Sequence, residues 1–85
     1  MNQPRKDPKP GRARFVAEHM EWLRREEKVS VRELCRRTGK TAKYFDDLAE
    51  EKEVLTLADF IDICAALGYI ASDVLDDILR DMPRP

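Results

Sequence analysis

The sequence has 85 residues, enough for one small domain that buries only about 60 to 65% of the surface its unfolded chain exposes. A large enclosed active site is therefore not expected. Hydrophobic residues make up 42% of the chain and charged residues 39%, which indicates a small core beneath a heavily charged surface.

The net charge of −1 conceals an uneven distribution of charge along the chain. Residues 1–43 contain 13 Lys and Arg against 6 Asp and Glu, whereas residues 44–85 contain 3 against 11. A basic first half can attract nucleic-acid phosphates, and an acidic second half would keep the rest of the surface away from the backbone. The alternative explanation of the same pattern is attraction between the two halves of one small domain.

The sequence contains too few metal-binding or catalytic residue types to indicate an enzyme. Cys35, Cys64 and His19 cannot supply the four ligands of a zinc site, and no Ser/His/Asp set or glycine-rich phosphate loop occurs. We expect two free buried thiols, a partly buried structural histidine, no cofactor and no enzymatic activity. The N-terminal residues lack the apolar stretch of a signal peptide, and no run approaches the roughly 18 apolar residues that span a membrane, so a cytoplasmic location is expected.

The N-terminal residues 1–11 and the segment after them differ sharply in composition. The first eleven, MNQPRKDPKPG, contain three prolines and no apolar residue beyond Met1, which predicts a disordered basic arm. From Arg12 to about Glu27 apolar residues recur at helical spacing, which predicts the first helix. Its expected inward face consists of Phe15, Val16, His19, Met20, Trp22 and Leu23.

Two short helices separated by a glycine turn are predicted next. Ser30 followed three residues later by Glu33 forms a capping box, after which a helix runs over residues 31–38 and stops at Gly39. Thr41 is the expected cap of the third helix. The inward pair of that helix is Phe45 and Leu48. A helix, a tight glycine turn and a helix are the sequence form of a helix-turn-helix.

The second half of the chain predicts two more helices. Thr56 is the expected cap of the fourth, which ends at Gly68, and Ser72 that of the fifth. The apolar set of the fourth is Leu57, Phe60, Ile61, Ile63, Cys64 and Leu67. No strand pattern occurs, so the predicted fold is all-α: a compact five-helix domain over residues 12–82, with a central helix-turn-helix and a tail at residues 83–85.

The segment "VSVRELCRRTGKTAKYFDDLAEEKEVLTLADFIDICAALGY" resembles the helix-turn-helix of phage Cro and repressor proteins and of the wider xenobiotic-response-element family. The resemblance extends over residues 14–80 and implies a lambda-repressor-like fold. The residues that carry it are Leu34 and Cys35 in the second helix, Gly39 in the turn, Thr41 at the cap, Phe45 and Leu48 in the third helix, and the run "LTLADFIDICAALGY".

The resemblance implies contacts with duplex DNA at named positions. It places base contacts at the start of the third helix, at Ala42, Lys43 and Asp46. It places backbone contacts at Ser30 and Val31, where a helix N-terminus attracts phosphate, and at Tyr44 and Asp47. Neighbouring residues complete the predicted backbone contacts: Arg32, Arg36, Lys40 and Thr41. The basic residues predicted to track DNA from the arm are Arg5, Lys6, Lys9, Arg12 and Arg14.

Several residues depart from the family pattern in ways that weaken DNA recognition or the packing of the turn. Val31 stands where glutamine is common, and Thr38 and Lys40 stand where apolar residues are common. Asp46 and Asp47 replace polar or basic residues. With Glu50, Glu51 and Glu53 they form an acidic run that phosphates would repel, although an aspartate can accept a hydrogen bond from cytosine N4.

Two functions remain open from the sequence. The first is a small sequence-specific transcriptional regulator, a phage or bacterial repressor, that reads duplex DNA with its third helix. The second is a helix-turn-helix-shaped protein-binding module, such as an anti-repressor, an antitoxin or a host-factor inhibitor, whose acidic third helix faces a basic partner. A homodimer is expected, because two recognition helices about 34 Å apart meet successive major grooves. Its predicted contacts lie in and before the fifth helix: Ile70, Val74, Leu75, Ile78, Leu79 and Met82.

Overall fold

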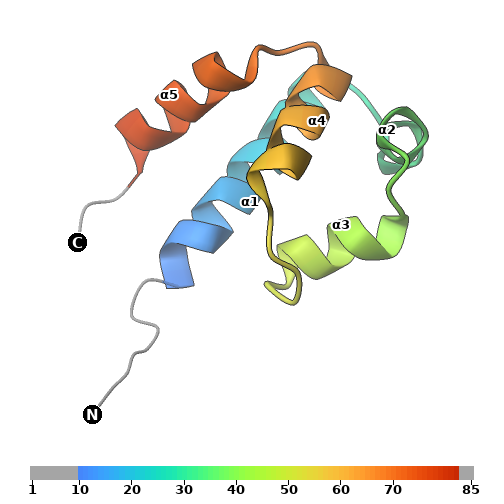
Figure 1. Cartoon of the computed structure of the whole chain (residues 1–85), viewed down its shortest axis with the longest axis horizontal. Helices are drawn as coiled ribbons and strands as arrows, with labels where there is room; N and C mark the ends of the chain where they lie inside the picture. Colours follow the sequence, from blue (N-terminus) through green and yellow to red (C-terminus); the bar gives the residue numbers. More distant parts are fainter. Residues whose placement is uncertain (1–9, 83–85) are drawn as a thin grey trace.

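The computed structural model describes residues 10–82 and places five α-helices there, with no strand among those residues (Figure 1). The helices are α1 (Pro10–Glu26), α2 (Val31–Thr38), α3 (Ala42–Ala49), α4 (Leu57–Leu67) and α5 (Ala71–Asp81). The predicted all-α, five-helix fold class with a central helix-turn-helix is therefore confirmed.

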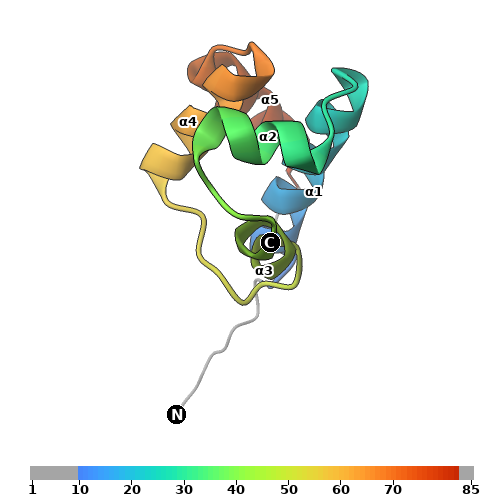
Figure 2. The ribbon, with the colours of Figure 1, turned by 90° about the vertical axis from the view of Figure 1, so that its right-hand side faces the viewer.

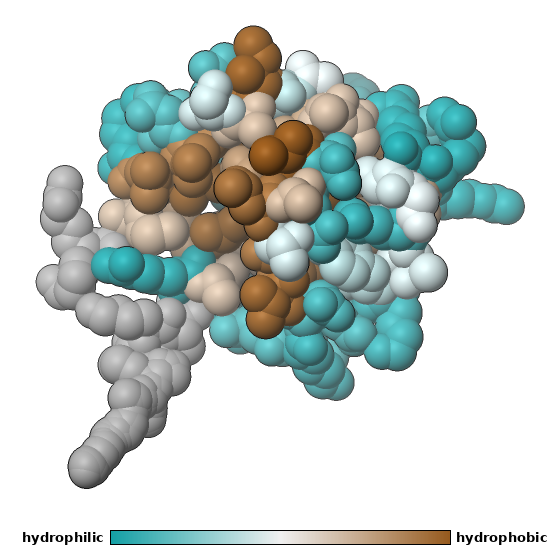
Figure 3. Space-filling view, viewed as in Figure 1, coloured by the Kyte–Doolittle hydropathy of each residue, from teal (hydrophilic) through white to brown (hydrophobic). Residues whose placement is uncertain are grey.

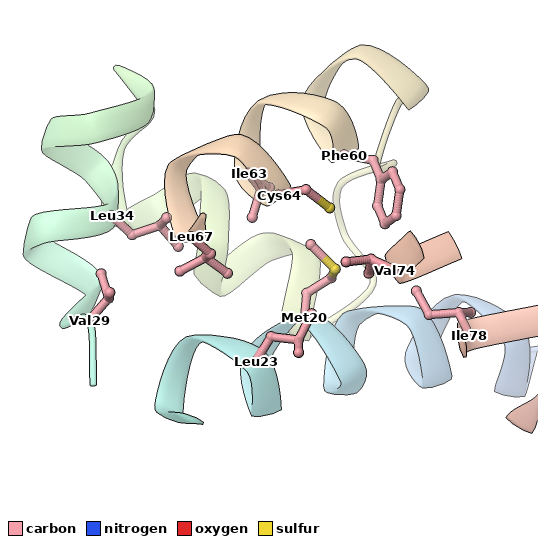
Figure 4. Close-up of a cluster of buried hydrophobic side chains, with 10 residues drawn as sticks. All are labelled: Met20, Leu23, Val29, Leu34, Phe60, Ile63, Cys64, Leu67, Val74 and Ile78. Carbon is pink, nitrogen blue, oxygen red and sulfur yellow. The ribbon is translucent and has the colours of Figure 1, made fainter. Parts of the chain in front are cut away.

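The core lies between α4 and the helices around it. Its buried side chains are Met20, Leu23, Val29, Leu34, Phe60, Ile63, Cys64, Leu67, Val74 and Ile78 (Figure 4). Four of them belong to α4, which packs against α2 and α5. Helix α3 contributes no buried residue, and its Tyr44, Phe45 and Leu48 are half-buried. Figure 2 shows α3 end-on beneath α2, at the margin of the domain. Helix α3 therefore packs against the core through half-buried side chains and contributes no fully buried one.

The two cysteines differ in burial. Cys64 is fully buried in α4, and this burial raises the pKa of its thiol to about 11. Cys35 is half-buried, because it lies on the edge of the inward face of α2. The prediction of two buried thiols is thus correct for Cys64 alone.

Three predictions about local structure need correction. Helix α1 begins at Pro10, two residues before the predicted start, since proline suits the first helical position, where no backbone N–H is needed. Trp22 is 55% exposed, although His19 beside it is half-buried as expected. Ser72 does not cap α5: the cap position is Ile70, two residues earlier, and the Ile70 carbonyl accepts from the N–H groups of Asp73 and Val74 without any side-chain cap.

The predicted dimer contacts in α5 and at its two ends differ in burial. Val74 and Ile78 are 3% and 1% exposed and belong to the core, so their assignment to a dimer interface is wrong. Met82 is half-buried and packs against the same core. Ile70, Leu75 and Leu79 are exposed. Within α5, Val74 and Ile78 therefore belong to the core of the domain, and Leu75 and Leu79 face solvent.

Three helices end in the same hydrogen-bonding pattern, the Schellman motif. After α1, the Lys28 N–H donates to the Arg25 carbonyl and the Val29 N–H to the Arg24 carbonyl. The same pattern follows α3 at Glu51 and α4 at Gly68. The motif needs a left-handed residue, and Lys28 and Glu51 adopt φ values of 57° and 61° there. A side chain with a Cβ is strained in that conformation.

Replacement of Lys28 by glycine is expected to raise the free energy of unfolding by about 0.5 to 1 kcal/mol. Glycine removes the Cβ strain of about 1 to 2 kcal/mol, and the greater freedom of the unfolded chain offsets part of that gain. Urea denaturation followed by circular dichroism measures the change. Lys28→Ala is the control, because it removes the exposed side chain and keeps the Cβ. A glycine variant no more stable than the alanine variant would contradict the strain at this position.

Candidate nucleic-acid interface

The turn between α2 and α3 is built from local hydrogen bonds. Gly39 adopts φ 76° and its N–H donates to the Cys35 carbonyl at 2.8 Å, which ends α2. An added Cβ at Gly39 would meet no neighbouring atom, so glycine is required there by φ alone. The Thr41 hydroxyl accepts from the Tyr44 N–H at 3.1 Å and caps α3. The turn is thus limited to residues 39–41, and the two helices have a defined relative orientation.

Thr38 and Lys40, which replace apolar residues of the family pattern, make polar contacts that hold the turn. The Thr38 hydroxyl donates to the Leu34 carbonyl at 2.8 Å and accepts from the Lys40 N–H at 3.3 Å. The Lys40 ammonium lies 2.7 Å from a carboxylate oxygen of Asp59 on α4. Polar bonds therefore take the place of the apolar packing that the family pattern predicts.

Asp59 joins the turn and the first part of α3 to α4. Its second oxygen accepts from the Tyr44 hydroxyl at 2.6 Å, and the Lys40 ammonium also lies 5.1 Å from the centre of the Tyr44 ring. The hydrogen bond from Lys40, followed by that from Tyr44, holds the pKa of the Asp59 carboxyl below its ordinary value. Burial, then the bond to Asp59, raises the pKa of Tyr44 well above its usual range. We call Lys40, Tyr44 and Asp59 the α3 anchor.

The α3 anchor changes the interpretation of two predicted DNA-backbone contacts. Only 17% of the Lys40 side chain is exposed, and the hydroxyl of the half-buried Tyr44 is bonded to Asp59. Both polar groups are engaged inside the domain. Asp59 itself was not among the predicted site residues. Its sequence context, three residues after Thr56, indicates a helix start and carries no signal for contacts to residues 15 and 19 positions earlier.

The opposite side of α3 presents the predicted base contacts to solvent. Ala42, Lys43 and Asp46 are all exposed in the first half of the helix. The Lys43 ammonium, on a side chain 82% exposed, lies 2.7 Å from the carboxylate of Asp47, which is 21% exposed. This contact raises the pKa of Lys43. The single basic side chain of α3 is thereby paired with an acid of the same helix.

The N-terminal end of α2 is exposed beside the turn. Ser30 and Arg32 are exposed and Val31 is half-buried. The Ser30 hydroxyl accepts from the Glu33 N–H at 3.0 Å, which is one half of the predicted capping box. The other half is absent, because the Glu33 carboxylate instead accepts from Arg36 and from Arg37.

Glu33 forms an ion pair with Arg36, one of the predicted DNA-backbone contacts. Its oxygens lie 2.9 Å from Arg36 Nε and 2.8 Å from Arg37 Nε, and these bonds lower the pKa of Glu33 to about 2. Arg37 also donates to the Ala66 carbonyl at 2.9 Å, near the C-terminus of α4. By contrast, Arg32 makes no ion pair within residues 10–82. Arg32 is thus the basic side chain of α2 that remains available to a phosphate.

Glu33 is expected to make stability depend on pH in the acid range. Because its pKa is lowered in the folded state, its contribution is present above its ordinary value of 4.5 and is lost as pH falls toward 2. Glu33→Gln should therefore lose less stability than the wild type between those pH values. The effect should be small, since the ion pairs are exposed. Thermal unfolding at several pH values measures it. Glu26→Gln is the control, and an equal flattening in both variants would contradict the role of Glu33.

The predicted arm is partly outside the described residues. Arg5, Lys6 and Lys9 fall outside the described range, as does the tail at residues 83–85. Arg12 is exposed in the first turns of α1, and Arg14 forms an ion pair of 3.0 Å with Glu51, beyond the end of α3. Arg14 therefore draws one of the acids that follow α3 toward α1.

No three His, Cys, Asp or Glu side chains within residues 10–82 are grouped so that they could hold a metal ion. In the same residues, no helix has both the length and the apolar character needed to cross a membrane.

Comparison with known proteins shows a likeness of fold. Neither a protein-family model nor a curated protein sequence matches the chain. Among solved structures, it is similar to the clp gene regulator ClgR from C. glutamicum, with a TM-score of 0.74 and 20% sequence identity over 87% of this chain and 96% of that chain. The chain therefore shares its five-helix fold, including the helix-turn-helix of α2 and α3, with a gene regulator.

Proposed function

We propose that this chain binds duplex DNA through α2 and α3 and acts as a small transcriptional regulator, a repressor of the Cro and phage-repressor kind. The observation that carries the proposal is the two-sided arrangement of α3. The α3 anchor ties one side of the helix to α4, while Ala42, Lys43 and Asp46 are exposed on its outer side. A helix fixed from behind and open in its first turns is suited to enter a major groove. The likeness of fold to a gene regulator supports the same function.

The geometry revises the proposed DNA contacts. Ala42, Lys43 and Asp46 remain the proposed base contacts. The proposed backbone contacts that keep an accessible polar group are those at the exposed start of α2 and of α3: Ser30, Val31, Arg32 and Thr41. Arg12, predicted as part of the basic arm, is kept as a proposed backbone contact at the start of α1. Lys40 and Tyr44 support the interface from inside the domain, and Arg36 and Asp47 are engaged in ion pairs.

Selection from a random pool of duplex DNA at physiological salt tests the proposal. The full chain is incubated with the pool, and the retained DNA is sequenced. Enrichment of a palindromic motif with half-sites about one helical turn apart would support a dimeric sequence-specific regulator. Lack of any enriched motif, with binding that disappears on modest addition of salt, would contradict it.

Two substitutions at the start of α3 should have different effects on the selected DNA. Lys43→Ala is expected to weaken binding about tenfold, and Asp46→Ala to change the preferred base at one position with a smaller loss of affinity. Fluorescence anisotropy with the selected sequence and its single-base variants measures both. Lys52→Ala is the matched control, because it removes an exposed lysine beyond α3. An equal loss in the Lys43 and Lys52 variants would indicate general charge attraction without base reading.

The acidity of α3 favours a second candidate function, binding to a basic protein surface. Asp46 is exposed and makes no ion pair within residues 10–82, and the one basic side chain of α3, Lys43, is paired with Asp47. Charge reversal with Asp46→Arg and Asp47→Arg distinguishes the two functions. The double variant should gain affinity for DNA if α3 faces phosphates, and should lose its partner if α3 faces a basic protein.

We also propose that a homodimer forms through the exposed apolar residues of α5 and of its cap position, Leu75, Leu79 and Ile70. On α4, Leu57 and Ile61 are exposed as well. Figure 3 shows hydrophobic residues gathered over α4 and α5 on one face of the domain. Exposed apolar residues gathered in one place are typical of an interaction surface. Sedimentation at micromolar concentration should give the mass of a dimer, and a monomeric mass would contradict this assignment.

A further inference from the structure

A cavity of about 410 Å³ lies between α1, α3 and the segment that leads from α3 to α4. Its volume falls within the range of about 300 to 1,000 Å³ that is typical of small-molecule sites. Apolar side chains form most of its wall. They include Val16 and Met20 from α1, Phe45 and Leu48 from α3, and Leu55 from the connecting segment.

Incomplete packing of α3 leaves this space. Protein interiors normally contain few voids larger than a water molecule. Here α3 contributes no buried side chain, and the small residues Ala13, Ala17 and Ala49 line the cavity where larger ones would fill it. The core of the domain is formed by the other four helices and the α1–α2 connection. Three core residues, Met20, Leu34 and Ile63, also line the cavity, which therefore lies directly beside the core.

The mouth of the cavity is acidic. Glu51, Glu53 and Val54 line the cavity and are exposed, which places them at its opening. Glu51 is paired with Arg14 at 3.0 Å, whereas Glu53 makes no ion pair or side-chain hydrogen bond within residues 10–82.

The basic residue of the cavity wall is already engaged. Arg24 donates to Glu21 at 3.0 Å through Nε and to the Val29 carbonyl at 2.6 Å. An anionic ligand would thus find no free basic side chain in the wall and an unpaired carboxylate at the mouth. A cationic group would be attracted by the unpaired carboxylate at the mouth and would meet no free basic side chain that repels it.

We propose that the cavity binds a small apolar molecule that carries one positive charge. The apolar part of the ligand contacts Val16, Met20 and Phe45, and its cationic group lies at the mouth beside Glu53. Helix α3 forms one wall, so a bound molecule contacts the proposed recognition helix from the side opposite to its exposed residues. This inference does not depend on the proposed DNA binding, because the ligand contacts only the rear of α3.

Three probes that share one ring system test the cavity and the charge preference. They are 2-naphthylmethylammonium, 2-naphthalenemethanol and 2-naphthoate, each titrated into the full ¹⁵N-labelled chain and followed by amide chemical shifts. The ammonium probe should bind most tightly and naphthoate least, with saturable shifts in α1, α3 and the connecting segment. Absence of saturable shifts there for every probe would overturn the site. Equal or tighter binding of naphthoate would overturn the charge preference.

Filling the cavity should prevent binding. Ala17→Leu is expected to weaken the ammonium probe about tenfold or more, because the added side chain takes space that the ligand needs. Ala13→Leu fills the cavity from an exposed position and replaces the first variant if that one does not fold. Ala65→Leu, at an exposed position on α4 outside the cavity, is the control and should bind as the wild type does. Unchanged affinity in the filled variants would overturn the site.

Glu53→Gln separates the charge from the cavity. It should weaken the ammonium probe about two- to fivefold, as expected for an exposed ion pair, and leave the alcohol unchanged. An equal loss for both probes would overturn the role assigned to Glu53. None of these measurements contains DNA, so their failure is distinguishable from failure of the proposed function.

Discussion

Replacement of Ile78 by alanine is expected to lower the free energy of unfolding by about 2 to 5 kcal/mol. The side chain is 1% exposed, so truncation removes buried apolar surface and leaves a cavity in the core. Small domains have only about 5 to 15 kcal/mol of stability in total. The variant should therefore unfold at much lower urea concentration than the wild type, as measured by circular dichroism.

The neighbouring residue supplies a matched control for the Ile78 variant. Leu79 has the same number of carbon atoms and is 61% exposed, so Leu79→Ala should change the free energy of unfolding of the monomer by less than about 0.5 kcal/mol. If α5 forms the proposed dimer, Leu79→Ala should weaken self-association in sedimentation. A stable Ile78 variant with impaired self-association would show that Ile78 lies in the interface and would contradict the core described above.

Replacement of Asp59 by alanine is expected to release α3 from α4. It removes the common acceptor of Lys40 and Tyr44 and leaves both polar groups without their partner in a largely buried setting. Because α3 has no buried side chain to compensate, its amide hydrogens should exchange at least about tenfold faster, whereas those of α1 and α4 should change less. Hydrogen exchange followed by NMR or mass spectrometry measures this difference.

Asp62 on the same helix is the control for the Asp59 variant. It is exposed, and it makes no ion pair within residues 10–82, so Asp62→Ala should leave exchange in α3 unchanged. If DNA is the partner, the Asp59 variant should also bind the selected sequence more weakly although Asp59 itself lies outside the proposed interface. A uniform increase of exchange across all helices would show that Asp59 supports the whole domain and would contradict a specific role for the α3 anchor.

Local features of the fold could be predicted from the sequence because they depend on neighbouring residues. Thr41 and Thr56 accept hydrogen bonds from N–H groups three residues later, as their cap patterns predict. Gly39 and Gly68 end helices in the left-handed conformation. The partial capping box at Ser30 shows the limit of this approach. The Glu33 carboxylate accepts hydrogen bonds from Arg36 and Arg37, one turn away, in place of the Ser30 N–H.

The assignment of apolar residues to the core or to the surface needed more than periodicity. The pattern of α5 places Val74, Leu75, Ile78 and Leu79 on one broad stripe, and only the direction from which α4 packs decides that the first and third are buried. Similarly, Leu57 and Ile61 share the apolar set of α4 and yet are exposed. When the apolar stripe of a helix is broader than the surface that a neighbouring helix covers, periodicity alone does not show which side of the stripe is buried.

The sequence by itself determined the five helices, the caps at Ser30, Thr41 and Thr56, and the position of the glycine turn, because hydrogen bonds and backbone conformation at these sites involve residues at most a few positions apart. Only the tertiary structure decided which charged and polar groups are paired between residues far apart in the sequence. It brings Asp59 to Lys40 and Tyr44 across 19 and 15 residues and pairs Arg14 with Glu51, contacts that leave no mark in local sequence. The exposed face of α3 and the cavity behind it likewise depend on how the helices pack, since they arise where helices meet and not within any one of them.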